Sequence, residues 1–273
     1  MDNQELVEDL NQNFKKNRDF RVSKPHIWIC PDKPKKRLVW PTNWVLDSND
    51  VAVMMDKPND IALYSNIAST QIDEAEMYYT EYIFPYGKKR SLRTVSVDEQ
   101  KAFYNYFEKA IVSVTQAYTS LEAMANIFIP ENYEVKKKEK NEIVKIWNKS
   151  AIELTYSLRD KFKDILRDVL KTSDPTQEKW WPTFIELEDL RNEIIHSKSS
   201  KSEDRYTKLL DTRIFRIVRN HKTVIEFYGK HIDSADKGLR NLFPYGFGMD
   251  TVLHRNISES TYDETWKDLT NPS

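Results

Sequence analysis

One short segment of the chain combines side chains that can move protons and hold phosphate oxygens. It covers residues 191–196 and reads RNEIIH. Histidine, whose ordinary pKa lies near 6.5, can serve as acid and base at neutral pH, and arginine is a permanently charged, forked donor to phosphate oxygens. Asn192 and His196 share a helix face, whereas Arg191 lies about 140° from His196 around a straight helix. We predict Arg191, Asn192 and His196 as a catalytic group.

The same spacing from arginine to histidine occurs twice more, at Arg21–His26 and at Arg216–His221. A proline just before His26 breaks any helix there. His221 falls on an apolar helical stripe and is expected to be a core histidine. Only the 191–196 segment has a polar residue directly after the arginine and ends the third of four predicted helices.

These helices are predicted from apolar residues that recur every three or four positions. The first is stopped by Pro130, and the fourth ends at Gly229, whose missing Cβ suits a helix end. Their ranges are about 103–128, 143–169, 177–196 and 206–229. Connections of this length predict a four-helix up-down bundle over residues 98–232.

The two flanks of this region have a different character. Residues 1–97 hold short aromatic and β-branched runs, which predict strands at 27–30, 38–40, 44–46, 51–55, 61–64 and 77–84. Several prolines make a regular sheet doubtful there. Residues 233–273 are turn-rich and polar, and we expect an irregular tail. The predicted fold class is mainly α, with an irregular β-containing region before the bundle.

Composition narrows the classes of function. The formal net charge is −1, so no global field recruits a partner. The five glycines form no phosphate-binding loop, and the histidines lack the spacing of a metal site on a helix. We therefore expect no cofactor and no metal. With no leader and no apolar stretch of about 20 residues, the expectation is a soluble, cytoplasmic protein without a membrane partner.

A family resemblance rests on two segments. The first predicted helix contains the sequence SLEAMAN at 120–126, and the third ends in RNEIIH. Together they resemble the HEPN superfamily (higher eukaryotes and prokaryotes nucleotide-binding), over residues 98–232, or half the chain. The resemblance implies a metal-independent endoribonuclease that works as a homodimer, as a toxin or an antiviral defence effector. Any antitoxin would be a separate protein.

The chemistry of RNA cleavage suits these residue types. His196 can take the 2′-hydroxyl proton or protonate the leaving 5′-oxygen, and Arg191 can offset charge on the phosphorus oxygens. Asn192 can orient the imidazole or the phosphate, and Glu122 is a possible helper. One motif alone is incomplete, so an arginine and a histidine from two copies are expected to converge on one phosphate.

Substrate binding is predicted just after this segment. Residues 205–230 hold seven Lys or Arg against two acidic residues, a local excess of +5. Arg213, Arg216 and Arg219 are the candidate contacts to RNA phosphates. Trp181 can stack on a base, whereas Trp180 lies on the core stripe and is expected to pack.

Three alternatives stay open at this stage. Arg191 can form a surface ion pair with Glu188, and His196 can simply favour the helix dipole. The protein can be a non-catalytic HEPN-like helical dimer that binds nucleic acid or a partner protein. Finally, the β-containing region can be the active unit, with the bundle as a dimerisation scaffold.

Overall fold

The computed structural model describes residues 19–31, 33, 36–40, 43–48, 51–87, 94–138, 144–196, 202–235, 237–248, 250, 252 and 254–270. The chain is mainly helical, with a few short strands. It divides into two units, which are residues 63–228 (the helical unit) and residues 1–62 with 229–273 (the terminal unit). These limits differ from the predicted boundaries at 97 and 232.

The helical unit is built mainly from four long helices and a series of shorter elements. The long helices are α2 (Asp60–Tyr78), α4 (Val97–Phe128), α8 (Trp181–Ile195) and α10 (Arg213–Ala235), and the first and last of these extend into the terminal unit. The shorter elements are η1 (Tyr79–Ile83), α3 (Phe84–Gly87), β5 (Glu134–Lys138), β6 (Val144–Asn148), α5 (Lys149–Thr155), α6 (Leu158–Asp160), η2 (Lys161–Leu166), α7 (Arg167–Leu170), η3 (Pro175–Gln177) and α9 (Ser202–Leu209).

Helix α4 confirms the first predicted helix. It begins with a capping box, in which Ser96 Oγ accepts from the Glu99 amide while Glu99 Oε2 accepts from the Ser96 amide at 2.7 Å. It ends just before Pro130, as predicted. Its buried positions recur every three or four residues and include Tyr106, Tyr118 and Leu121.

Helix α2 corrects the strand predicted at 61–64, and its end, with η1 and the start of α3, corrects the one predicted at 77–84. Asn59 caps its first turn, with Asn59 Oδ1 accepting from the Ala62 amide at 3.2 Å. Its buried face includes Ser65, Ala68 and Ala75. Because these side chains are small and weakly apolar, the helical stripe is faint in the sequence, and the neighbouring aromatic residues suggest strands instead.

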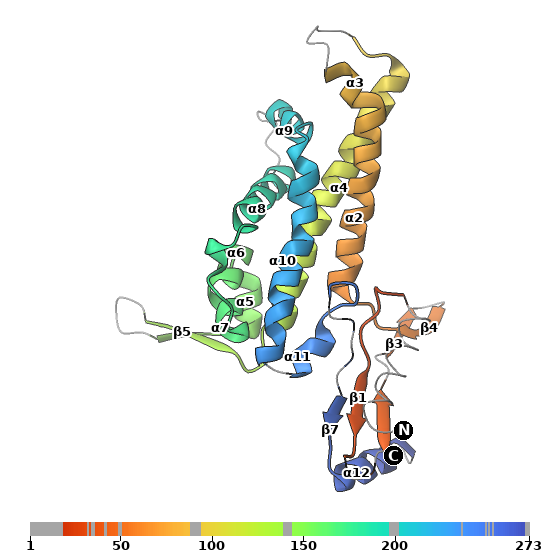
Figure 1. The fold of residues 1–273 in the computed structure, drawn as a ribbon, viewed down its shortest axis with the longest axis vertical. Coiled ribbons are helices and arrows are strands. Elements are labelled where there is room, and N and C mark those ends of the chain that lie inside the picture. The colour runs from red at the N-terminus through yellow and green to blue at the C-terminus, as the bar shows by residue number, and fades with distance from the viewer. Residues whose placement is uncertain are drawn as a thin grey trace. The chain divides into compact units, whose positions relative to one another are not determined.

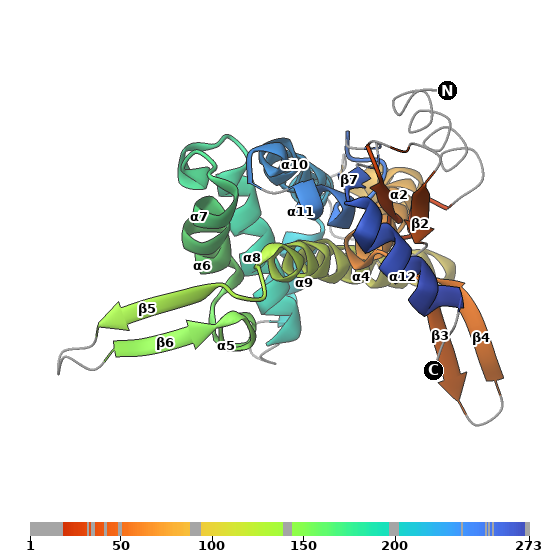
Figure 2. The same cartoon turned by 90° about the horizontal axis from the view of Figure 1, so that it is seen from below.

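The second predicted helix is also wrong over its first part. Residues 144–148 form strand β6, which pairs antiparallel with β5, and this hairpin extends away from the helices of the helical unit (Figure 2). Trp147 therefore packs edge-on against Tyr156, with ring centroids 5.9 Å apart. The lysine run at 136–138 lies in β5. The rest of that prediction is broken at Ser157, whose hydroxyl caps α6.

Helix α8 confirms the third predicted helix, after a short 3-10 turn. The fourth is interrupted between α9 and α10. Gly229 does not end it, because α10 continues to Ala235. A Cβ at Gly229 would lie 2.6 Å from Phe243 Cζ, so the glycine permits close packing in the terminal unit.

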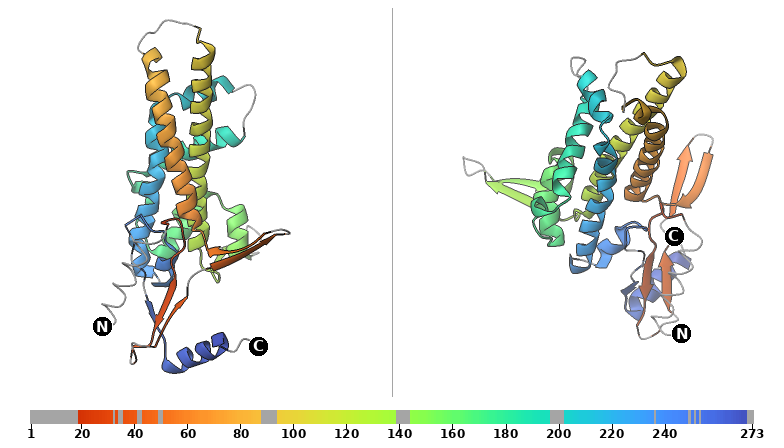
Figure 3. Two further views of the ribbon diagram at one scale, coloured as in Figure 1. Left: turned by 90° about the vertical axis from the view of Figure 1, so that its right-hand side faces the viewer. Right: turned by 45° about the horizontal axis from the view of Figure 1, so that its top comes forward.

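Side-chain contacts fix the long helices against one another, and Figures 1 and 3 show α2, α4 and α10 running alongside each other. Lys109 of α4 forms an ion pair with Glu74 of α2. Trp180, directly before α8, packs on Phe227 of α10 with ring centroids 5.3 Å apart. Phe162 of η2 completes this aromatic core, 5.1 Å from the ring of Tyr228.

The terminal unit holds the strands of both chain ends. Strand β1 (His26–Ile29) lies between β2 (Arg37–Trp40), antiparallel, and β7 (His254–Asn256), parallel. Strands β3 (Asn43–Ser48) and β4 (Val51–Asp56) form a separate hairpin. Four of the predicted strands are thus confirmed. The predicted irregular tail contains β7, α11 (Lys237–Leu242) and α12 (Glu259–Thr270), because Ile27 and Ile29 bury against Tyr245 and Val252.

Candidate functional site

The end of α8 carries the predicted catalytic group. Pro182 lies in the first turn of the helix, and Phe184, Leu187 and Leu190 form its buried face. The helix ends at Ile195, and His196 leaves the helical conformation while its amide still donates to the Asn192 carbonyl at 2.9 Å. The buried face of α8 therefore holds the helix in place and positions the polar residues at its C-terminal end.

Arg191 points toward α4. Its guanidinium carbon lies 4.7 Å from the centroid of the Tyr118 ring, which is the geometry of a cation–π contact. Its Nη1 donates to Asn192 Oδ1 at 3.1 Å. The alternative of an ion pair between Arg191 and Glu188 is not what the structure contains, because Glu188 is paired with Arg159.

Tyr118 is the centre of a polar cluster. Its hydroxyl donates to Glu188 Oε1 at 3.4 Å, and Glu188 Oε2 accepts from Arg159 Nε at 2.9 Å and from Arg159 Nη2. Burial raises the pKa of Tyr118, and the carboxylates of Glu188 and Glu122 raise it further, so the hydroxyl stays protonated. We call Tyr118, Glu122, Arg159, Glu188 and Arg191 the Tyr118 cluster.

The 120–126 segment of α4 faces a buried cation. Lys161 is buried, and its Nζ donates to Asn126 Oδ1 and to the Glu153 carbonyl, both at 2.9 Å. Burial lowers the pKa of Lys161, while the charge of Glu122 opposes that shift. Glu122 thus acts electrostatically on both Tyr118 and Lys161, and Tyr118 is also the residue that Arg191 contacts.

His196 opens onto a pocket on the opposite side. The pocket has a volume of about 690 Å³, and its walls are the end of α8 and the helix α9. Asn192 and His196 line it together, with Arg205 and Lys208 from α9. Three acidic side chains stand against these two basic ones in the lining, and Lys208 is already paired with Glu193.

The predicted catalytic residues are therefore divided between two faces of α8. Asn192 joins them, because its Oδ1 accepts from Arg191 while the residue itself lines the His196 pocket. Arg191 is not part of that lining as the structure describes it. A single chain thus holds its arginine and its histidine apart.

The three candidate phosphate contacts on α10 all face carboxylates. Arg213 Nε lies 2.9 Å from Asp211, and Arg219 Nη2 lies 2.6 Å from Asp73 Oδ1 and also contacts Glu76. Arg216 Nη2 is 3.9 Å from Glu186, at the long limit of an ion pair. RNA would have to compete with these acids, of which the local charge count included only Asp211.

Two other sequence interpretations are confirmed. His221 is fully buried, where its Nδ1 donates to the Val218 carbonyl at 2.6 Å and its Nε2 accepts from Ser65 Oγ at 2.7 Å. Burial lowers the pKa of His221 to about 4, so it is a neutral core residue. Trp180 is buried as predicted, while Trp181 is half-buried.

Sequence reasoning missed Tyr118, Arg159 and Lys161. Tyr118 lies four residues before Glu122, and that helical spacing was an available signal. Arg159 and Lys161 come from a segment that was predicted to be one continuous amphipathic helix, so no local sequence signal identified them as site residues.

Comparisons of the chain with family models, curated proteins and solved structures find no match. Within the described ranges, no three His, Cys, Asp or Glu side chains gather as a metal site requires. None of the helices in these ranges has the length and apolar character needed to cross a bilayer.

Proposed function

We propose that the protein is a HEPN-type, metal-independent endoribonuclease. In this proposal α4, the α5–α7 segment, α8 and α10 take the places of the four bundle helices. The observation that carries it is the end of α8, where Asn192 binds Arg191 and shares a solvent-accessible pocket with His196. The contact of Arg191 with the Tyr118 ring adds support, because Tyr118 lies on α4 just before the 120–126 segment and the contact links the two segments on which the resemblance rests.

The reaction follows from the side chains. An imidazole takes the proton of a 2′-hydroxyl, and that oxygen attacks the adjacent phosphorus. The bond from phosphorus to the 5′-oxygen breaks, and the leaving oxygen takes a proton from an imidazolium. The products are a 2′,3′-cyclic phosphate and a 5′-hydroxyl. Arg191 offsets the charge that develops on the phosphorus oxygens, and Asn192 orients the reacting groups.

A homodimer completes the proposed site. Because Arg191 and His196 lie on different faces of α8, a second copy related by a two-fold axis can supply the missing partner. Arg191 of one chain and His196 of the other would then act on one phosphate, and the imidazole that takes the 2′-hydroxyl proton would return it to the leaving 5′-oxygen.

The setting of this activity is part of the same proposal. The protein would act in the cytoplasm as a toxin or antiviral defence effector, with any antitoxin as a separate protein. Arg213, Arg216 and Arg219 would contact RNA phosphates outside the cleavage position, and that binding would weaken with added salt.

The test is an RNA cleavage assay in EDTA. Purified wild type, Arg191→Ala, Asn192→Ala and His196→Ala are incubated with total RNA and with transfer RNA, and the product ends are identified. We expect cleavage with cyclic phosphate ends by wild type and its loss in Arg191→Ala and His196→Ala. Arg167→Ala is the matched control, because this exposed arginine lies outside the Tyr118 cluster and the His196 pocket.

Two outcomes contradict the proposal. Unchanged cleavage by a folded His196→Ala variant removes the assigned residue. RNA or partner binding by a folded dimer without any cleavage favours the alternative, a non-catalytic HEPN-like dimer that binds nucleic acid or a protein.

A further inference from the structure

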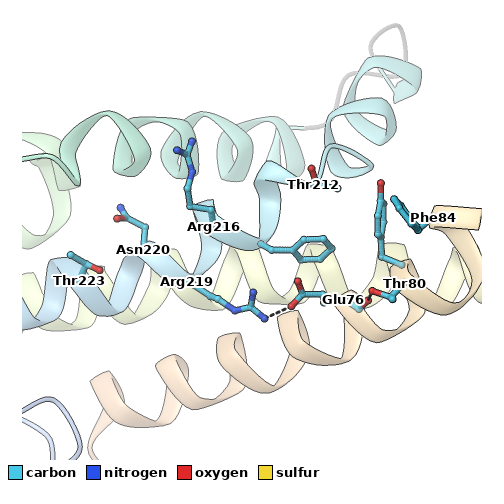
Figure 4. A pocket seen from close by; sticks show the side chains of 10 residues that line it. Glu76, Thr80, Phe84, Thr212, Arg216, Arg219, Asn220 and Thr223 are labelled. Atoms are coloured by element: carbon cyan, nitrogen blue, oxygen red, sulfur yellow. Dashed lines mark hydrogen bonds and ion pairs between the residues drawn. The ribbon is translucent and has the colours of Figure 1, made fainter. Parts of the chain in front are cut away.

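A second hollow of the helical unit lies on α10, away from the His196 pocket. It has a volume of about 790 Å³ and shares no lining residue with that pocket. We call it the α10 trough. Figure 4 shows Arg216 at one edge, Arg219 and Glu76 at the other, and Phe84 and Thr212 at one end. A hollow of this size falls in the range of about 300–1,000 Å³ that small-ligand sites occupy.

Aromatic side chains form one end of the trough. Tyr79 begins the π-helix η1, and its ring meets the buried Phe215 ring edge-on at 5.5 Å. Phe84 follows the same π-helix and is 46% exposed at the mouth. Single π-helical turns occur frequently at functional sites, because they displace side chains from regular helical positions. This end of the trough offers a fixed aromatic wall and an exposed ring.

The charges of the trough are asymmetric. Arg219 Nη2 is held by Asp73 and Glu76, which ties α10 to α2. Arg216 is 65% exposed, and its nearest carboxylate, Glu186, is 3.9 Å away. Arg216 therefore keeps forked donors that an anionic group can use.

Polar side chains lie on both sides of Arg216, with Thr80 and Thr212 at the aromatic end and Asn220 and Thr223 toward the other end (Figure 4). Asn220 donates its Nδ2 to the Trp180 carbonyl at 3.1 Å, which fixes the amide and directs its Oδ1 as an acceptor. Thr212 and Thr223 add hydroxyl groups to the lining. Such groups suit the hydroxyls of a sugar.

We propose that the α10 trough binds a nucleoside phosphate, with the base against Phe84 and Tyr79 and the phosphate on Arg216. The aromatic end suits a planar ring, the hydroxyls of Thr80 and Thr212 at that end suit a sugar, and the Arg216 guanidinium suits a doubly accepting anion. The same unit occurs as a free mononucleotide and as one nucleotide of a single-stranded RNA. The inference goes beyond the proposed cleavage site, since binding here does not require that the protein cut RNA.

Calorimetric titration of the full-length protein tests this site. The probes are adenosine monophosphate, uridine monophosphate and a short oligouridine, and the protein carries His196→Ala so that the oligonucleotide stays intact. Loss of base stacking in Phe84→Ala and of a charge-assisted hydrogen bond in Arg216→Ala should each weaken binding by about tenfold or more. Arg167→Ala, at an arginine with similar exposure, should leave binding unchanged.

Each outcome bears on the proposal. If a mononucleotide binds and both variants lose that binding, the proposal is supported and the ligand is a free nucleotide. If only oligouridine binds and both variants lose that binding, the proposal is supported and the ligand is RNA. No binding of any probe by folded protein overturns it, as does binding that neither variant weakens. If this binding persists while wild type cleaves no RNA, the proposed function fails and the trough stands.

Discussion

Removing the Arg159 guanidinium should destabilise the protein, because the buried Glu188 carboxylate then lacks its ion-pair partner. The Glu188 side chain is 8% exposed, and it accepts two hydrogen bonds from the Arg159 guanidinium and a longer one from the Tyr118 hydroxyl at 3.4 Å. The variant Arg159→Met keeps most of the side-chain volume and removes the charge and both donors. The carboxylate then retains one long hydrogen bond.

Two considerations limit the expected loss of stability from above. Breaking a fully buried ion pair costs about 3–5 kcal/mol, but the Arg159 side chain is 44% exposed, so water can replace part of the contact. Protonating a glutamate of ordinary pKa at pH 7 costs about 3.7 kcal/mol, and this sets a ceiling. We expect a loss of about 2 kcal/mol at pH 7. Because protonation relieves the isolated carboxylate, the loss should shrink toward pH 5.

Urea denaturation followed by far-UV circular dichroism measures this difference, provided that the slope with urea stays constant. Adding Glu188→Gln to Arg159→Met should recover most of the loss, since it removes the uncompensated charge. Arg167→Met, at an arginine whose carboxylate lies 4.0 Å away, should change stability by less than about 0.5 kcal/mol. A loss that is equal at pH 7 and pH 5, or absent at both, would refute the reasoning.

Three further outcomes are expected. Mixing inactive Arg191→Ala with inactive His196→Ala should restore about one quarter of the wild-type cleavage rate, because half of the dimers are mixed and each mixed dimer has one of its two composite sites intact. If the dimers are shown to exchange subunits and no activity returns, the site is not composite. Gly229→Ala should lower the free energy of unfolding by about 1–3 kcal/mol despite the better helix propensity of alanine, since its Cβ would lie 2.6 Å from Phe243 Cζ. Urea denaturation measures this loss, which should be smaller in a Phe243→Leu background. The unfolded chain protonates His221 below about pH 6.5, whereas the folded protein protonates it only near its folded pKa of about 4, so the stability advantage of wild type over His221→Gln should fall by about 1.4 kcal/mol for each unit by which the pH is lowered between these values. An advantage that stays constant over this range contradicts a buried neutral imidazole.

The candidate site shows which parts of its arrangement could be predicted from local sequence. The types and spacing of Arg191, Asn192 and His196 predicted that the latter two share a face and that the arginine does not, and the structure has this arrangement. The Tyr118 cluster was not predictable in the same way. Its members come from α4, α6 and α8, and only packing brings Arg159 to Glu188 across the intervening chain.

The sequence by itself determined the elements whose pattern is strong and locally complete. Helices α4 and α8 have regular apolar stripes and clear ends, and strands β1–β4 have short β-branched and aromatic runs between turn residues. Tertiary structure decided the remainder. The small buried side chains of α2 form a stripe only when α10 packs against them, as the contact of Ser65 with His221 shows. Strand β6 exists because β5 pairs with it, and residue 229 is a glycine inside α10 because Phe243 occupies the space that a Cβ would need. In each case the free energy that selects the conformation comes from a partner distant in sequence, which a local pattern cannot contain.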